Sequence, residues 1–429
     1  MSTSKQGPLS PEKYEKIKFY LIQEISQNLD ADPPQSHEDH RRKTEKWLKE
    51  AYAGIEKQLG LTKAQREHLF SETMAELIGF GHIQPLLAEP DISEIMITGP
   101  HQIYVERNGK LEDTDATFAD EAHLMRIINR ILSPLGRRVD IEHLMADARL
   151  PDGSRVNIAI PPVAVDGACV TIRKFLESKL TMEQIIDLGT ATSHMAEFFE
   201  ACVATRLNIL ITGNTSSGKT TLLNILTNYI PDDERIITIE DAAELKLNQK
   251  YVVRMETKMP NVDGVGGVVT RDLVRNALRM RPDRIVVGEV RSGEALDMLQ
   301  AMNTGHDGSL TTLHANSPRD AISRLETMAM MAGLDMPLSA LRAQIASAID
   351  LIIHMERLAD GSRRITRVSE VPRMEGSIVT LSDIFVFERT YTSSDGTIHG
   401  EMKATGLRPI FSPRLKAAGF TLSGDVFGA

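Results

Sequence analysis

A glycine-rich loop carries the strongest chemical signal in this sequence. Residues 213–221 read GNTSSGKTT, which fits the spacing G-x-x-x-x-G-K-[ST]. Glycines let backbone N–H groups turn toward a phosphate, Lys219 adds a charge near the β- and γ-phosphates, and the Thr220 hydroxyl can ligate Mg²⁺. The pattern therefore predicts a site for ATP and Mg²⁺. The predicted phosphate-binding residues are Gly213, Asn214, Thr215, Ser216, Ser217, Gly218, Lys219, Thr220 and Thr221.

The elements on either side of this loop fit the same interpretation. The apolar run Leu207–Thr212 predicts a buried strand, and the run TLLNILTNY after Lys219 predicts a helix. A helix N-terminus at this point adds positive potential for an anion. An ordinary glycine-rich turn is the alternative, and the strand–loop–helix context favours nucleotide binding over it.

Two later strand candidates end in carboxylates. The run IITI leads into Glu240 and Asp241, and the run IVVG leads into Glu289. Ligands of open α/β sheets bind at the carboxyl ends of strands, where such carboxylates can hold Mg²⁺ or orient an attacking water. A solvated turn residue or helix cap is the alternative, and we favour it for Glu244 and Glu294. For Glu240 and Glu289 we favour a functional role.

Two histidines flank one short strand candidate, Gly308–Leu313. His306 lies in GHDG before it and His314 lies in LHAN after it. Each is either a structural residue or a contact to the nucleotide. Contact is the favoured interpretation for His314, and both interpretations stay open for His306. Neither histidine has the spacing of a metal site.

Arginines recur along one predicted helix. Arg271, Arg275 and Arg279 are spaced by four residues and share a helix face, and Arg281 and Arg284 follow. A solvated face is one interpretation. Pairing with phosphates, or with acids of an adjacent subunit, is the other. The spacing does not decide between them.

Length and composition restrict the class of protein. The 429 residues suggest two to three domains, and 41% hydrophobic with 25% charged residues is ordinary globular usage. The net charge of −10 disfavours bulk nucleic-acid binding. Two cysteines and an N-terminus without an apolar core indicate a reducing, cytoplasmic environment. No run is long enough to predict a membrane span.

The pattern of elements changes along the chain. We expect a flexible lead-in over 1–40, a helical bundle over 41–78, an α+β domain over 79–175, a linker over 176–185 and an α/β nucleotide-binding domain with a C-terminal extension over 186–429. Strands alternating with helices in the last region predict a parallel sheet covered on both faces. Shorter strands after residue 349 predict an antiparallel extension of that sheet.

Four sequence boxes together resemble a family. GNTSSGKTT, TIEDAAEL, RPDRIVVGEVR and TGHDGSLTTLHANS occur in the order found in the secretion ATPases of type II and type IV systems, which include type IV pilus motors. The lead-in and the runs RVNIAIPP and ITGPHQIYVERNGKLE are most similar to the TadA/CpaF branch, which serves tight-adherence pili. The resemblance covers about residues 79–390. It implies a RecA-like P-loop NTPase domain preceded by a small PAS-like α+β domain.

The resemblance also implies roles for individual residues. It assigns Glu240 to the attacking water, and it brings two arginines of the N-terminal domain, Arg155 and Arg173, near the γ-phosphate. An arginine arriving from another domain stabilises charge only when the site closes. The residues predicted for catalysis are Glu240, Glu289, Arg155, Arg173, His306 and His314, and those predicted for the metal are Thr220, Asp241 and Glu289.

This sequence departs from relatives in two places. Gly288 precedes Glu289 where many P-loop ATPases have Asp-Glu, which weakens the prediction of Mg²⁺ ligation there. The tetracysteine zinc module of some type II secretion ATPases is absent, which argues against that branch.

The function implied is a homo-hexameric motor that hydrolyses ATP to power assembly of a pilus or a related secretion machine. Its expected partners are inner-membrane platform proteins, through which it would lie at the inner face of the cell membrane. A RecA-like nucleic-acid translocase is an alternative, disfavoured by the acidic charge and by the 5% aromatic content. A nucleotide-gated scaffold with little turnover is another, disfavoured by the complete set of acids and histidines.

Overall fold

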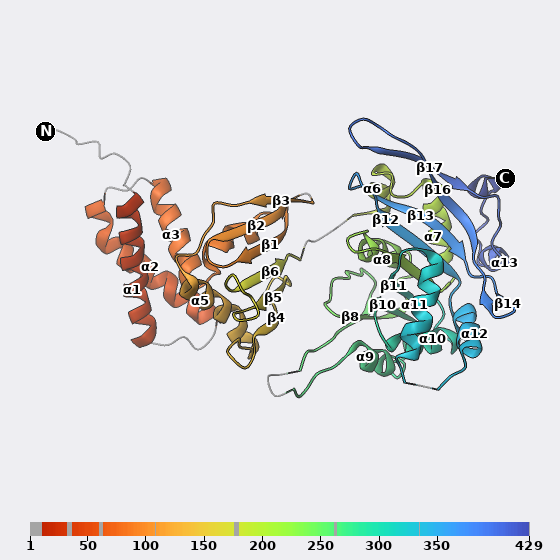
Figure 1. Ribbon diagram of the computed structural model, residues 1–429, viewed down its shortest axis with the longest axis horizontal. Helices are drawn as coiled ribbons and strands as arrows, with labels where there is room; N and C mark the ends of the chain where they lie inside the picture. The colour runs from red at the N-terminus through yellow and green to blue at the C-terminus, as the bar shows by residue number, and fades with distance from the viewer. Residues whose placement is uncertain are drawn as a thin grey trace. The chain divides into compact units, whose positions relative to one another are not determined.

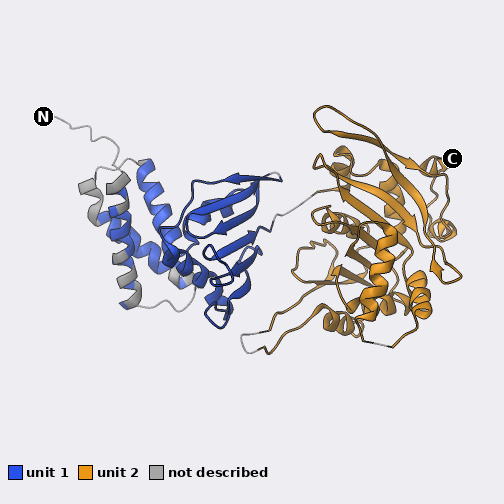
Figure 2. Ribbon diagram, viewed as in Figure 1, with its two compact units in different colours: residues 1–176 blue, residues 177–429 orange. Residues whose placement is uncertain are grey.

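The computed structural model describes residues 11–31, 37–59, 63–107, 109–175, 180–260, 264–333 and 335–428. The chain divides into an N-terminal unit, Met1–Leu176, and a C-terminal unit, Glu177–Ala429 (Figure 2). The linker predicted over 176–185 includes residues 176–179, which lie outside the described ones.

Helices come first in the N-terminal unit and strands follow (Figure 1). Its elements are α1 (Pro11–Ala31), α2 (His37–Leu59), α3 (Lys63–Leu77), η1 (Gly81–Ile83), α4 (Gln84–Ala88), β1 (Ile92–Thr98), β2 (Gln102–Arg107), β3 (Lys110–Asp113), α5 (Glu121–Leu132), η2 (Ser133–Leu135), β4 (Met145–Arg149), β5 (Arg155–Ala159) and β6 (Cys169–Arg173).

The first helix differs from the flexible lead-in expected over 1–40. Leu21 and Ile25 of α1 are fully buried in one cluster with Leu48 of α2 and Leu69 of α3. Most of the stability of a protein helix comes from packing its apolar face. The short apolar pattern in α1 therefore supports a helix because α2 and α3 provide partners for it.

A six-stranded sheet forms the rest of the N-terminal unit, in the order β3-β2-β1-β6-β5-β4. Every neighbouring pair is antiparallel. Helix α5 packs Ile127 and Ile128 against inward residues of the sheet such as Ile95, Val156 and Ile172. Because side chains alternate along a strand, the residues between these point to the opposite face. The α+β organisation expected from the sequence is confirmed.

The C-terminal unit alternates strands and helices and then ends in strands. Its elements are α6 (Met182–Asp187), α7 (Ser193–Ala204), β7 (Ile209–Gly213), α8 (Lys219–Thr227), β8 (Arg235–Glu240), β9 (Tyr251–Glu256), α9 (Thr270–Ala277), β10 (Arg284–Val290), α10 (Glu294–Asn303), β11 (Leu310–His314), α11 (Pro318–Met330), α12 (Leu338–Ala348), β12 (Leu351–Arg357), β13 (Arg363–Glu370), β14 (Met374–Glu375), β15 (Ile378–Val379), β16 (Ser382–Thr392), β17 (Ile398–Ala404), α13 (Ser412–Ala417) and η3 (Gly424–Phe427).

A nine-stranded sheet runs through this unit in the order β17-β16-β13-β12-β7-β11-β10-β8-β9. The strands from β12 to β9 pair in parallel. Strands β13, β16 and β17 add to its edge as antiparallel neighbours. The parallel core sheet and its antiparallel extension are both confirmed. The edge strand β9 was not among the predicted strands.

Helices cover both faces of this sheet, so its central strands are apolar on both sides. In β7, Ile209 and Ile211 pack in one core with α7 and α8, and Leu210 packs in a second core with α10, α11 and α12. All five residues of β7 are buried. The carboxyl ends of parallel strands meet at one edge of the sheet, and Gly213, Glu240, Glu289 and His314 lie at these ends. Within the described part of the chain, no helix has the length and apolarity that crossing a membrane requires.

Candidate functional site

The predicted phosphate-binding residues form one loop between β7 and α8. Gly213 has φ +150°, and a Cβ there would lie 2.2 Å from the carbonyl oxygen of Met355. Gly218 has φ +98° and stands immediately before the first residue of α8. Only glycine fits either position without strain, since side chains disfavour positive φ and a Cβ at residue 213 would overlap backbone. The two glycines of the motif therefore fix the path of the loop.

The interior of the loop suits an anion. Lys219 is 7% exposed, and its Nζ donates to the carbonyl oxygen of Asn214 at 2.9 Å. The buried Ser217 Oγ has no hydrogen-bond partner among the described residues. A buried hydroxyl without a partner is costly, and a phosphate oxygen could supply one. Together with the N-terminus of α8, these groups fit the phosphates of a nucleotide.

Strand ends bring the predicted acids and one histidine to the same edge. Nε2 of His314, the last residue of β11, lies 3.1 Å from Oε1 of Glu289 in β10. Nδ1 of His314 lies 3.5 Å from Nζ of Lys219. The structure thus joins Lys219, His314 and Glu289 in one chain of polar contacts. His314 therefore lies beside the phosphate loop, and its contact with a nucleotide stays a prediction.

The charge states of His314 and Glu289 follow from the groups around them. Burial and the nearby Lys219 ammonium hold the pKa of His314 below its usual value, so the imidazole is neutral near pH 7. Burial acts to raise the pKa of Glu289, but the guanidinium of Arg291 and the ammonium of Lys219 outweigh it and lower that pKa. Glu289 is therefore ionised. A neutral His314 can accept from Lys219 at Nδ1 and donate to Glu289 from Nε2.

Arg291 binds both acids predicted for the metal. Its Nη1 donates to Asp241 at 2.7 Å and its Nη2 donates to Glu289 at 2.8 Å. Oxygens that converge on one guanidinium are arranged for a cation, and carboxylates with a hydroxyl are ligands that Mg²⁺ prefers. Asp241 and Glu289 therefore converge on one cationic group, and their ligation of Mg²⁺ together with Thr220 stays a prediction.

Glu240 is the second buried acid at this edge. Its Oε1 accepts from the backbone N–H groups of Glu244 and Leu245, both at 2.9 Å, and its Oε2 is buried without a partner among the described residues. Burial raises the pKa of Glu240 to about 7. A carboxylate with that pKa can exchange a proton with water near neutral pH. The arrangement therefore suits a general base.

Packing against Glu240 explains why a glycine stands before Glu289. A Cβ at Gly288 would lie 3.0 Å from Cγ of Glu240 and 3.5 Å from its Cβ. Any larger residue at 288, including the aspartate found in other P-loop ATPases, would crowd Glu240. The departure from Asp-Glu is thus coupled to the position of the buried glutamate.

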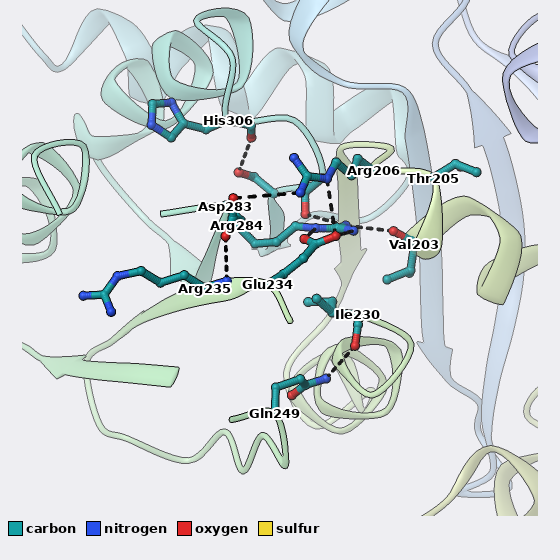
Figure 3. Close-up of polar contacts among 12 residues, drawn as sticks. Val203, Thr205, Arg206, Ile230, Glu234, Arg235, Gln249, Asp283, Arg284 and His306 are labelled. Carbon is teal, nitrogen blue, oxygen red and sulfur yellow. Dashed lines mark hydrogen bonds and ion pairs between the residues drawn. The ribbon is translucent and has the colours of Figure 1, made fainter. Parts of the chain in front are cut away.

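The structure does not bring His306 to this edge. His306 precedes β11 and His314 ends it, so the two histidines lie at opposite ends of one strand. The backbone oxygen of His306 accepts from Ser309 Oγ at 2.8 Å. Figure 3 places His306 near the buried pair Arg284–Glu234, at the end of the sheet opposite the phosphate loop. The strand geometry within the C-terminal unit therefore gives no support for a nucleotide contact by His306, and that contact stays a prediction.

Most of the predicted arginine stripe is paired within the chain. Nε of Arg271 and Nε of Arg275 each lie 2.8 Å from a different oxygen of Asp297. Arg284 is fully buried, and its Nη2 lies 3.1 Å from Glu234. The partners of these three side chains are acids of the same unit, while Arg275 also stays exposed, as expected for a solvated face. Arg279 is exposed, as expected for a solvated face.

The two predicted arginines of the N-terminal unit lie on adjacent strands. Arg155 begins β5 and Arg173 ends β6, and the two are directly opposite in the antiparallel register. Arg173 lies 3.6 Å from Glu94 of β1. Their contact with a nucleotide remains a prediction.

Two residues of the site were not identified from the sequence. Arg291 lies directly after β10, which ends at Val290, so no strand periodicity marks its pairing with Glu289 and Asp241. The other is His354 of β12, which is 2% exposed and has Nδ1 at 2.8 Å from Oγ1 of Thr212, the residue before Gly213. Nothing in the local sequence distinguishes this histidine from other strand residues.

Comparison with known proteins agrees with this geometry. The family model described as type II/IV secretion system protein matches residues 76–386. A protein of Mycobacterium tuberculosis, provisionally described as a conjugal transfer protein, is 34% identical over 335 residues, which are 77% of this chain and 94% of that protein. The type IV secretion system protein PtlH of Bordetella pertussis is 35% identical over 314 residues, 66% of this chain and 91% of PtlH.

A solved structure shows the same fold. The crystal structure of the pilus retraction motor PilT with bound ADP superimposes with a TM-score of 0.50 at 24% sequence identity. The similarity covers 64% of this chain and 77% of the PilT chain. At this identity the comparison shows the fold alone.

Proposed function

The chain belongs to the type II/IV secretion system protein family and is an ATP-hydrolysing enzyme, and on that premise we propose that it is a hexameric motor for a tight-adherence type IV pilus or a related secretion machine. The observation that carries this proposal is the contact chain Lys219–His314–Glu289, which links the phosphate loop to a strand-terminal carboxylate. The C-terminal unit would act as the RecA-like motor domain, and the six-stranded unit as its PAS-like partner.

Each residue at the sheet edge would have a separate role in ATP hydrolysis. The loop from Gly213 to Thr221 and the Lys219 ammonium would bind the phosphates, and Glu240 would accept a proton from the attacking water. Glu289 would orient that water, with its charge state fixed by His314 and Arg291. When Mg²⁺ is bound by Thr220, Asp241 and Glu289, it supplies charge neutralisation at the phosphates.

Coupling of hydrolysis to movement would come from the N-terminal unit. Arg155 and Arg173 would reach the γ-phosphate only when the two units, of one subunit or of neighbours in the ring, close on the nucleotide. Loss of the γ-phosphate would then release them. A motor of this kind transmits that movement to membrane-embedded platform proteins, and we propose that it works at the cytoplasmic face through them.

The pilus role is supported by the resemblance of RVNIAIPP and ITGPHQIYVERNGKLE to the TadA/CpaF branch. It can be tested in a strain that lacks this chain and is complemented with the wild type, with Glu289→Gln, or with Glu388→Gln as a matched control on β16. Surface filaments and secreted protein should return with the wild type and the control only. Equal filaments and secretion in all strains, including the deletion, would exclude the proposed role.

Enzyme assays distinguish the proposed motor from a nucleic-acid translocase and from a nucleotide-gated scaffold. A nucleic-acid translocase should hydrolyse ATP faster when single-stranded DNA is added, and the motor should not. A nucleotide-gated scaffold should bind ADP tightly and turn over slowly. We expect steady turnover that DNA leaves unchanged.

A further inference from the structure

An arginine of the antiparallel extension contacts the phosphate loop of the same unit. Nε of Arg363, the first residue of β13, donates to the carbonyl oxygen of Ser216 at 3.0 Å. Its Cδ lies 3.4 Å from the position that a Cβ of Gly218 would take. Arg363 and Ser216 are both exposed. The side chain of Arg363 therefore runs along the exposed side of the loop, beside the start of α8.

The sheet sets the position of Arg363. It is opposite Arg357, the last residue of β12, in the β12–β13 register. In the same strand, Met355 is opposite Gly213, where the loop begins. The backbone oxygen of Arg363 also accepts from Oγ1 of Thr190 at 2.8 Å. Within the described part of the chain, no carboxylate pairs with the Arg363 guanidinium, so the loop carbonyl is its partner.

Ser216 has a backbone conformation that needs support. Its φ is +59°, in the left-handed region that residues other than glycine adopt only at a cost. Relaxation of Ser216 to negative φ would rotate the peptide group that joins it to Ser217. Because Arg363 holds the carbonyl of that peptide group, its hydrogen bond opposes the rotation.

The same peptide group presents a donor to the interior of the loop. It is trans, so its N–H and its C=O point in opposite directions. The N–H of Ser217 donates to the carbonyl oxygen of Asn214 at 3.3 Å, and Nζ of Lys219 donates to that oxygen at 2.9 Å. The two donors therefore converge on one oxygen atom, as they would on an oxygen of a phosphate.

We propose that Arg363 is a positioning residue for nucleotide binding, which holds the Ser216 carbonyl outward and so keeps the Ser217 N–H directed at the phosphates. This inference rests on the proposed phosphate site. A charged donor on the carbonyl also polarises the peptide group, which makes its N–H a stronger donor. Arg363 acts on the loop and not on the reaction, so ADP and ATP should lose affinity equally without it.

Arg363→Met in the full chain tests the inference, because methionine keeps the apolar stem and loses the donor. The Kd for ADP and the KM for ATP should both rise by about 5- to 20-fold, while kcat stays within about two-fold. Calorimetric titration with ADP and steady-state phosphate release measure these constants. Arg367→Met is the matched control, since Arg367 is exposed on the same strand and pairs with Asp383 instead of the loop.

Ser216→Gly separates a positioning role from an effect of charge. Glycine adopts positive φ readily, so adding Ser216→Gly to Arg363→Met should recover at least about three-fold in ADP affinity, although it restores no charge. Absence of recovery would show that the guanidinium acts through its charge, and the positioning role would be overturned. It would also be overturned if Arg363→Met bound ADP as tightly as Arg367→Met.

Two further measurements check the fold and the phosphate site. The unfolding temperature of Arg363→Met without nucleotide should match that of the wild type, and Arg363→Gln replaces this variant if it does not fold. Lys219→Ala tests the phosphate site independently. Loss of ADP binding in Lys219→Ala with wild-type binding in Arg363→Met would overturn the inference and leave the proposed function standing. Wild-type ADP binding in Lys219→Ala would remove the phosphate site and the inference with it.

Discussion

The carboxylate of Glu289 and the imidazole of His314 meet at 3.1 Å although they lie on different strands. Strands β10 and β11 are parallel neighbours, with Val290 opposite Leu313 in the register. The pairing of the two strands therefore sets the distance between the side chains. Because His314 also lies 3.5 Å from Lys219, the β10–β11 register positions the acid relative to the phosphate loop.

Glu289→Gln should keep ATP binding and lose hydrolysis by about 10²- to 10⁴-fold, since glutamine keeps the shape and loses the charge and basicity. Equilibrium binding of a fluorescent ATP analogue and steady-state phosphate release measure the two properties separately. Glu388→Gln, which removes an exposed acid paired with Lys403, serves as the control. If binding falls as far as turnover, Glu289 holds the site together and does not act on the reaction.

Lys219→Ala should abolish turnover and greatly weaken nucleotide binding, because the phosphates lose their counter-charge. It should also shift the pH at which His314 titrates upward, since the Lys219 charge is one cause of its lowered pKa. Calorimetric titration with ATP and NMR of the histidine ring measure these effects. Lys403→Ala removes an exposed lysine as a control. Hydrolysis at the wild-type rate would rule out the phosphate site.

Removal of the buried pair Arg284–Glu234 should destabilise the protein strongly without changing the phosphate site (Figure 3). Nη1 of Arg284 also donates to the carbonyl oxygen of Val203 at 2.8 Å. Arg284→Met should lower the free energy of unfolding by about 3 kcal/mol, because the buried Glu234 would keep only the half-exposed Arg206, at 3.3 Å, as a partner. The exposed Arg279→Ala should change it by less than about 0.5 kcal/mol.

Gly308 offers a second test of the same pair. It has φ +83°, and a Cβ there would lie 2.3 Å from Nη1 of Arg284. Gly308→Ala should therefore destabilise the protein with Arg284 present and cost less in an Arg284→Met background, where the positive φ and the Cα of Arg206 at 2.9 Å still make alanine unfavourable. Denaturant unfolding of the two single variants and the double variant measures this coupling. Additive losses would show that the two positions are independent.

Local patterns predicted the parts of the site that depend on short sequence stretches. The loop from Gly213 to Thr221 requires glycine at two backbone positions, and Glu240 and Glu289 follow apolar runs long enough for one strand. These predictions hold in the folded protein because each residue and the backbone or strand feature that requires it lie within ten positions of each other. The sheet edge then follows from the rule that ligands bind at the carboxyl ends of parallel strands.

Features that depend on distant partners were not predictable in this way. Helix α1 is stabilised because Leu21 and Ile25 pack against Leu48 and Leu69. The sequence around α1 does not show that these two residues are its packing partners. The pairing of Arg271 and Arg275 with Asp297 joins residues more than twenty positions apart. A periodic stripe of arginines shows which helix face they share, and it cannot show which acids another helix brings to them.

His354 should make stability depend on pH. Burial, together with the charges of Arg367 and Lys219, lowers its pKa, although Glu356 acts in the opposite direction. A histidine whose folded pKa is depressed contributes stability that is present above its unfolded pKa, about 6.5, and is lost as pH falls through the folded value. His354→Gln, which can keep the hydrogen bond to Thr212, should therefore weaken the loss of stability between about pH 7.5 and about pH 5.5.

Denaturant unfolding of the wild type and His354→Gln at both pH values checks this expectation. The exposed His399→Gln, on β17, is a control that removes a histidine from the surface. An equal decrease in unfolding free energy for the wild type and His354→Gln would show that His354 keeps its usual pKa in the folded protein.

The last prediction concerns Arg155 and Arg173, which are opposite each other on β5 and β6. If they serve only surface pairing, replacing either with alanine should cost little, because exposed ion pairs contribute about 0–1 kcal/mol. If they reach the γ-phosphate when the two units close, loss of either should reduce turnover on the order of 10³-fold and spare ADP binding. Arg155→Ala and Arg173→Ala should be made separately, with ADP affinity, ATPase rate and ring assembly measured on each and Arg126→Ala, at an exposed position of α5, as control. Unchanged ATPase in both would remove the proposed coupling of hydrolysis to movement between the units, while reduced ATPase with intact ADP binding and ring assembly would assign the two arginines to the triphosphate.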